Sequence, residues 1–185
     1  MKLGEFYSVV CKIFALDFSG AINDKIFEGI KRNGEWFIRN ESEANLKGRE
    51  LYKEALDNET SDDIRKDFKN LEKYFVATHF FESDDERLAK LYQICGFEPN
   101  LKSLKIDSIS NQLSFLSAVI KLEANEKTEE ILGVFLSSYL LPYAAKLAVM
   151  LQKEAKSKFY RSLGYLFEDF ANGLEKTLKI KVVPR

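Results

Sequence analysis

The stretch Ile106-Asp107-Ser108-Ile109-Ser110-Asn111-Gln112-Leu113-Ser114-Phe115-Leu116 lies in the second half of the chain and predicts how the protein is built. Its apolar residues recur at alternating spacings of three and four, which places them on one face of an α-helix. Asp107 stands where this helix opens after a loop, the position of an N-cap whose side chain accepts a hydrogen bond from a first-turn amide. We therefore expect a core helix that opens at Asp107.

The same helical spacing continues on both sides of this stretch and predicts a protein with few or no strands. The apolar stripes cover residues 3–14, 22–30, 46–56, 64–75, 88–95, 106–120, 131–151 and 159–178. Residues 97–105 form the longest expected loop in the second half, and Pro142 should kink the helix over 131–151. We expect one all-α, single-domain helical bundle over residues 1–178, followed by an extended C-terminal tail over 179–185.

Short polar motifs mark several ends of these expected helices. Asn33-Gly34 is typical of a helix C-terminus, because glycine adopts the left-handed backbone conformation that ends many helices. Thr60 and Ser83 stand at N-cap positions, and Gly96 should stop the helix that Ser83 opens.

Composition excludes nucleic acid as a partner. The 185 residues include 28 Lys and Arg against 29 Asp and Glu, so the chain lacks the single-sign field with which a nucleic-acid binder neutralises phosphates. Hydrophobic residues make up 45% of the chain and include 15 Phe and 8 Tyr. This content is typical of a folded domain with a large aromatic core.

Cysteine usage and the apolar runs predict the location of the protein. Cys11 and Cys95 are too few to staple a secreted domain, so we expect free thiols in a reducing, cytoplasmic compartment. Residues 1–6 lack the features of a signal peptide. The run Ile131–Leu151 is long enough to span a bilayer, but it contains Lys146, Pro142 and two serines. We expect it to be a buried helix of the bundle and not a membrane insertion.

The sequence contains no recognisable catalytic or metal-binding pattern. His79 is the only histidine, and it has no Ser or Cys partner near it in sequence. The common zinc and di-iron motifs and a phosphate-binding glycine loop do not occur. The acidic runs Asp62-Asp63 and Asp84-Asp85-Glu86 fall in first turns of expected helices, where carboxylates interact favourably with the helix dipole. We therefore expect no enzymatic activity, no metal ion and no cofactor of the chain's own.

Several segments between about residues 71 and 175 carry a shared set of motifs. Residues 106–116 are close to the pattern Pro-Asp-His-Leu-Ala-x-Glu-Leu-x-Phe-Met. Residues 135–143 are close to Phe-Leu-x-x-His-Leu-x-Pro-Trp, and residues 158–163 contain the Phe-Tyr-x-x-Leu that follows it. Upstream, residues 71–75 resemble a Tyr-x-x-Leu-Phe region and residues 80–83 a Pro-Tyr-Glu-Ser turn.

These motifs belong to the TorD/DmsD/NarJ family, the dedicated assembly chaperones of molybdenum-cofactor oxidoreductases, which this chain resembles. The resemblance implies a TorD-like helical bundle and a cytoplasmic role in redox enzyme maturation. Such a chaperone binds the N-terminal peptide, often a twin-arginine signal peptide, of the catalytic subunit of a molybdopterin-containing oxidoreductase. It holds the immature enzyme until the cofactor is inserted, before export or assembly.

A receptor for such a peptide needs an apolar groove beside carboxylates or other acceptors, because guanidinium groups form strong bidentate hydrogen bonds to carboxylates. Ten residues in the resembling segments are candidates to bind the client peptide: Asp107, Ser108, Gln112, Tyr74, Phe75, Phe81, Glu82, Glu98, Tyr139 and Tyr143. Helix capping and peptide binding are compatible roles for Asp107.

The chain also departs from the family pattern. Ile106, Ser108 and Gln112 stand where the family usually has Pro, His and Glu, and Tyr139 and Tyr143 replace a His and a Trp. A second function therefore stays open, that of a helical protein-interaction or regulatory module that keeps the fold without binding signal peptides. The sequence is equally compatible with a monomer and with a domain-swapped dimer.

Overall fold

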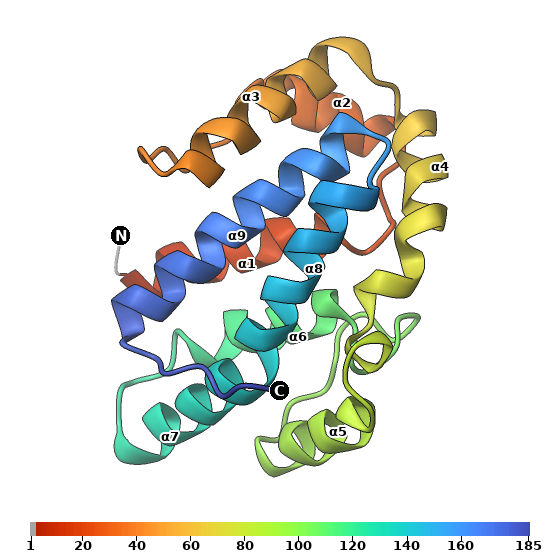
Figure 1. Ribbon diagram of the computed structural model, residues 1–185. Helices are drawn as coiled ribbons and strands as arrows, with labels where there is room; N and C mark the ends of the chain where they lie inside the picture. The colour runs from red at the N-terminus through yellow and green to blue at the C-terminus, as the bar shows by residue number, and fades with distance from the viewer. Residues whose placement is uncertain (1–2) are drawn as a thin grey trace. The chain divides into compact units, whose positions relative to one another are not determined.

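The computed structural model describes residues 3–185 and confirms the all-α prediction (Figure 1). The described residues contain no named strand, and a single antiparallel bridge joins Val76 to Ser108. The α-helices are α1 (Leu3–Asp17), α2 (Asp24–Asn33), α3 (Glu43–Asn58), α4 (Ser61–Leu71), α5 (Asp84–Ile94), α6 (Ile109–Val119), α7 (Glu126–Phe135), α8 (Leu141–Glu154) and α9 (Lys158–Leu178). Short 3-10 turns cover Glu72–Phe75 and Ala77–His79.

The helices form two compact units that interleave along the chain. The described residues of the first unit are 3–19, 75–143 and 180–185, and the second unit comprises residues 20–74 and 144–179. Each unit therefore combines segments that are far apart in sequence. The tail expected after residue 178 begins where α9 ends, and residues 180–185 belong to the first unit.

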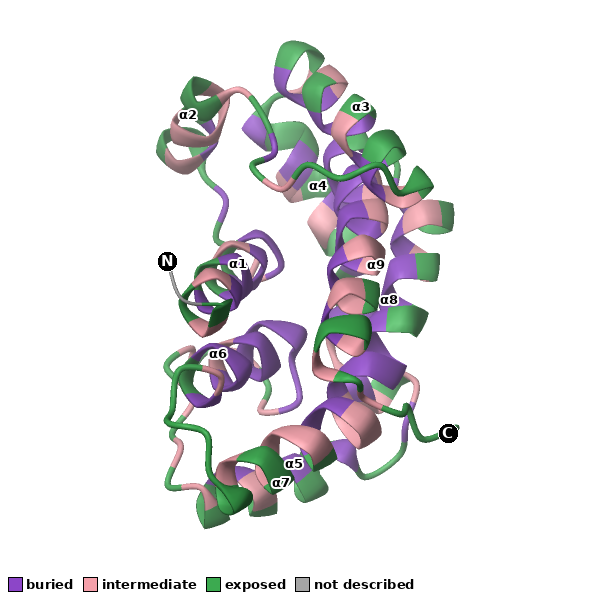
Figure 2. Ribbon diagram, turned by 90° about the vertical axis from the view of Figure 1, so that its left-hand side faces the viewer, coloured by how far each residue is buried: buried purple, intermediate pink, exposed green. Residues whose placement is uncertain are grey.

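In the first unit, α1 packs against α6, and the hydroxyl groups of Ser8 and Ser117 lie 2.8 Å apart in their buried contact. Leu113 and Leu116 are fully buried, as their place on the apolar stripe predicts. Four aromatic rings connect α5, the following loop, α6 and α7 with centroid distances of 4.8–5.1 Å: Tyr92, Phe97, Phe115 and Phe135. Figure 2 shows the resulting burial of α6.

In the second unit, α3 packs along α9. Two carboxylates hold the N-terminus of α9: Asp67 accepts hydrogen bonds from the amides of Lys156 and Ser157, and Glu59 accepts from the next two amides. These bonds satisfy first-turn amides that have no partner within the helix. Burial of Phe167 in α9 confirms that its apolar stripe faces the core.

A π-helical turn, Leu136–Leu140, lies between α7 and α8, just before Pro142, where the sequence predicts a kink. The amide of Leu141 donates to the carbonyl of Leu136, five residues earlier. Pro142 has no amide hydrogen, so it cannot continue this pattern to the carbonyl of Ser137 or return to the α-helical one at Ser138. One of these two carbonyls thus lacks a donor that a residue other than proline would supply.

One helical stretch, Glu126–Glu154, has the length and apolar character needed to cross a bilayer. Of its most apolar window, 56% is buried inside the protein. Such burial is also typical of a core helix.

The predicted helix ends were correct where local sequence decides them. Thr60 and Asp63 form a reciprocal capping box at the start of α4, and Gly34 ends α2 with a φ of 71°. Two predicted side-chain caps were wrong. Ser83 precedes α5 with a φ of 61° and makes no capping hydrogen bond, and the residue that caps α6 is Ser108, whose hydroxyl accepts from the amide of Asn111.

Candidate arginine-binding site

The first unit holds an arginine side chain in a site built from the start of α5 and the π-helical turn. We call this the arginine site and define it by Phe81, Asp84, Tyr139 and the backbone carbonyls of Ser137 and Ser138. The arginine is Arg185, at the end of the described tail. All of these residues lie within the first unit.

Asp84 receives the guanidinium group in a two-pronged geometry. Nη1 of Arg185 donates to Oδ2 over 2.9 Å, and Nη2 donates to Oδ1 over 2.5 Å. Nη1 also donates to the carbonyl of Ser138 over 2.8 Å. Paired, charge-assisted hydrogen bonds of this kind are the geometry in which arginine differs most from lysine.

Two aromatic rings flank the same guanidinium group. Its central carbon lies 4.4 Å from the ring centroid of Phe81 and 5.9 Å from that of Tyr139. A cation over an aromatic face is attracted by the ring quadrupole, by about 0.5–2 kcal/mol depending on desolvation. Phe81 and Tyr139 are two of the sequence-predicted peptide-binding residues, and the structure brings them together around this arginine.

Burial strengthens the ion pair. The side chain of Asp84 is 1% exposed and that of Arg185 is 15% exposed, so water screens their attraction far less than it would at the surface. The pKa of Arg185 is raised, chiefly by its hydrogen bond to Asp84, so the guanidinium group stays charged. Removing one partner of a buried pair leaves an uncompensated charge, which costs about 3–5 kcal/mol. The site is therefore selective for a cation that fills it.

The turn ahead of Pro142 supplies the remaining acceptors. The carbonyl of Ser137 accepts a hydrogen bond of 3.0 Å from the amide of Val183, and the carbonyl of Ser138 accepts from Arg185. These are the two carbonyls to which Pro142 cannot donate. The π-helical turn thus presents backbone acceptors to a peptide that runs past it.

The predicted residues at the opening of α6 have a different role. Asp107 is fully buried, and its Oδ2 accepts a 2.7 Å hydrogen bond from the amide of Thr78. Its backbone carbonyl accepts from the amide of Ala77 and from Nε2 of Gln112. Asp107, Ser108 and Gln112 therefore attach the turn Ala77–His79 to α6. They do not present acceptors at the surface, because each is less than 5% exposed.

Other buried polar atoms gather near Asp107. Burial raises the pKa of Tyr92 and of Tyr143, and the negative charge of Asp107 raises both further. Several oxygen atoms around the opening of α6 have no hydrogen-bond partner among the described residues: Tyr92 Oη, Asp107 Oδ1, Ser110 Oγ, Asn111 Oδ1 and Gln112 Oε1. This region is a buried polar junction and differs from an open binding groove.

The remaining predicted residues are spread over the chain. Tyr143 is fully buried and contacts the ring of Phe80, with centroids 5.9 Å apart. Phe75 is buried and stacks on Phe18. Tyr74 is buried and belongs to the second unit, whereas Glu82 and Glu98 are exposed.

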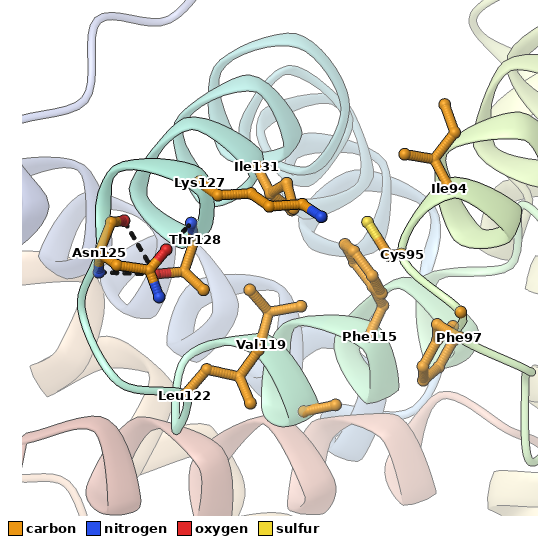
Figure 3. Close-up of a pocket in the computed structure, with 12 residues that line it drawn as sticks. Ile94, Cys95, Phe97, Phe115, Val119, Leu122, Asn125, Lys127, Thr128 and Ile131 are labelled. Carbon is orange, nitrogen blue, oxygen red and sulfur yellow. Dashed lines mark hydrogen bonds between the residues drawn. The ribbon is translucent and has the colours of Figure 1, made fainter.

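A separate apolar cavity of about 390 Å³ lies between the end of α5, α6 and α7 (Figure 3). Cys95, Phe115, Val119 and Ile131 line it, with Lys127 reaching across from α7. Burial raises the pKa of the Cys95 thiol, while Lys127 lowers it. The cavity wall is predominantly apolar and can accommodate an uncharged side chain.

The sequence interpretation missed the charged partners of the site. It assigned Asp84 to the helix dipole and placed Arg185 in an extended tail, with no role in the site. One signal was available: the tail Ile180-Lys181-Val182-Val183-Pro184-Arg185 has the basic and apolar character expected of a client peptide.

Within residues 3–185, no three or more His, Cys, Asp and Glu side chains are grouped so that they could hold a metal ion. A scan against protein-family models gives no match to this chain, and a search of curated proteins also gives none.

Proposed function

We propose that this protein is a cytoplasmic assembly chaperone that binds an arginine-bearing N-terminal peptide of a molybdopterin-dependent oxidoreductase subunit and holds it before export or assembly. The observation that carries the proposal is the arginine site, in which Asp84 and two aromatic rings enclose a guanidinium group. The all-α fold and the motif resemblance support the choice of client. In this proposal the protein is a binding protein and not an enzyme.

The geometry supports recognition of a peptide more than of free arginine. Among the described residues, Asp84, Ser138 and the two rings contact the guanidinium group, while the carbonyl of Ser137 accepts from a backbone amide two residues away. A ligand that uses the whole site therefore needs both an arginine side chain and a peptide bond at that spacing. Backbone recognition combined with one specific side chain is typical of peptide receptors.

The test is calorimetric titration with a synthetic peptide that carries two adjacent arginines followed by an apolar stretch. In the Arg185→Ala background, where the chain's own guanidinium group no longer fills the site, Asp84→Asn should weaken binding by at least about tenfold, since a hydrogen bond to a charged group contributes about 1.5–3 kcal/mol. Glu86→Gln is the matched control, because it neutralises an exposed carboxylate two residues away. The same peptide with both arginines replaced by lysine should bind wild type weakly.

Equal affinities of Arg185→Ala and Asp84→Asn/Arg185→Ala would contradict the proposed site. Arginine and lysine peptides that bind equally well would favour the alternative of a general helical interaction module.

A further inference from the structure

We infer that residues 180–185 are an internal ligand of the arginine site and that a client peptide must displace them to bind; the inference rests on the proposed function of this site. In the structure the guanidinium group in the site comes from the chain itself, from Arg185. The site is thus regulated by competition between the protein's own tail and its client.

The tail has the chemistry of a ligand for this site. It joins the apolar residues Ile180, Val182 and Val183 to the basic residues Lys181 and Arg185. Pro184 lies between Val183, whose amide binds Ser137, and Arg185, which binds Asp84. Its ring fixes φ near −65° and so limits the conformations of this segment. The tail therefore presents its two binding groups with little loss of conformational freedom. A client segment with an amide donor two residues before an arginine would fit in the same register.

The tail is held in a way that allows release. In the described part of the chain, its hydrogen bonds to the rest of the unit come from the Val183 amide and the Arg185 guanidinium group. Val182 and Val183 remain 36% and 48% exposed, so the tail leaves part of its apolar surface uncovered. Attachment concentrated in one side chain can be broken by a ligand that supplies the same group and buries more apolar area.

Attachment to the protein makes even a weak internal ligand effective. The tail and the site belong to one chain and to the same compact unit, so the tail binds in an intramolecular step. Short flexible tethers give effective concentrations on the order of millimolar. A tail whose free peptide has a dissociation constant of about 0.1 mM would then occupy roughly nine-tenths of the sites and weaken an external ligand about tenfold.

The experiment uses the full chain and a synthetic peptide with the sequence of residues 180–185 and blocked ends. The peptide is titrated against wild type and Arg185→Ala by calorimetry. Arg185→Ala should bind it at least about tenfold more tightly, because its site is no longer occupied. Lys176→Ala, which removes an exposed positive charge from α9 outside the tail, should retain the wild-type affinity. The double variant Asp84→Asn/Arg185→Ala should lose most of the binding, which would locate the peptide in the arginine site.

Each other outcome contradicts a distinct statement. If wild type and Arg185→Ala bind the peptide equally, the tail does not compete and the inference is wrong, while the arginine site stands. If neither binds it and Arg185→Ala also fails to bind the two-arginine peptide, the site is no peptide receptor and the proposed function fails too. Light scattering after size exclusion completes the test. A wild-type dimer that Arg185→Ala converts to a monomer would mean that the tail binds the site of a second copy. The inference that the tail binds its own chain would then be wrong.

Discussion

At the scale of single residues, Asp84 and Asp107 show how burial gives two carboxylates different roles. Both are fully buried in the first unit. Asp84 accepts from the guanidinium group of a distant side chain, whereas Asp107 accepts from the backbone amide of Thr78, which is a fixed part of the fold. We therefore propose ligand binding for Asp84 and structural support for Asp107.

Substitutions of Asp107 should change stability and not peptide affinity. Asp107→Ala leaves the partly buried amide of Thr78 without this acceptor, so it should lower the free energy of unfolding by about 1–3 kcal/mol. Asp107→Asn keeps an oxygen that can accept from the same amide and should be the more stable variant. Urea titration measures the loss, and calorimetry at matched folded fraction measures the affinity. A large loss of affinity in the Asn variant would mean that Asp107 contributes to peptide binding.

Asp17, at the C-terminal end of α1, should make stability depend on pH. Burial raises the pKa of this carboxyl from 3.8 to about 7 in the folded protein. Below pH about 4 it is protonated in both states, so its contribution to stability is fully present. As the pH rises from 4 to 7, only the unfolded state ionises, and the free energy of unfolding falls by up to roughly 4 kcal/mol.

The measurement is urea unfolding of wild type and Asp17→Asn at pH 5 and pH 8. Asparagine cannot ionise, so the variant should gain stability relative to wild type as the pH rises. A constant difference between the two proteins across this range would contradict the raised pKa.

At the scale of elements, the contact of α3 with α9 depends on a glycine. A Cβ atom on Gly48 would lie 2.6 Å from Cγ of Leu166 and 3.2 Å from its backbone nitrogen. Gly48→Ala should therefore destabilise the protein by about 1–3 kcal/mol through overpacking, although alanine favours helices. Gly29→Ala in α2, where nothing lies within 4 Å of the new methyl group, should instead stabilise by up to about 1 kcal/mol. Thermal unfolding of both variants provides the comparison.

The π-helical turn should contribute to arginine binding because of Pro142. Pro142→Ala restores an amide hydrogen that can donate to the carbonyl of Ser138, which now accepts from Arg185. We expect about 3–10-fold weaker binding of the tail peptide to Pro142→Ala/Arg185→Ala than to Arg185→Ala, because the added amide competes with the guanidinium group for this oxygen and weakens one charge-assisted hydrogen bond. Gly133→Ala, in the open part of α7, is the control for a general change in helix stability. Unchanged affinity in the proline variant would show that its carbonyl acceptors do not contribute.

At the scale of the whole molecule, the two interleaved units should unfold together. The segments 20–74 and 144–179 of the second unit are joined by residues 75–143, which fold in the first. Folding of the first unit therefore shortens the free loop that the second must close, which lowers its entropic penalty. Loss of structure in one unit should weaken the other.

Leu113→Ala tests this coupling. Leu113 is fully buried in the first unit, so its truncation should lower the free energy of unfolding by about 2–5 kcal/mol. Trp36, the only tryptophan, is buried in the second unit and reports on that unit by fluorescence. Its urea transition should shift together with the circular dichroism transition. An unshifted fluorescence transition would mean that the units unfold independently.

The sequence by itself determined the features that depend on residues close together in the chain. Helical periodicity predicted the all-α fold and the burial of Leu113, and Gly34 and Thr60 marked helix ends because caps act over three or four residues. Phe81 and Tyr139 were also identified, through motifs near them in the chain. These signals come from neighbouring residues and do not depend on the tertiary contacts of the rest of the chain.

Only the tertiary structure decided how the charged groups are paired. Arg185 and Asp84 are separated by 101 positions, and Asp107 and Thr78 by 29, so no periodicity or capping rule connects them. A carboxylate in the first turn of a helix interacts favourably with the helix dipole whether or not it also pairs with a distant cation. The residues around Asp84 in the sequence therefore could not show that it pairs with Arg185. Which charged groups pair depended on which side chains the fold buries together, because a buried charge without a partner destabilises the protein.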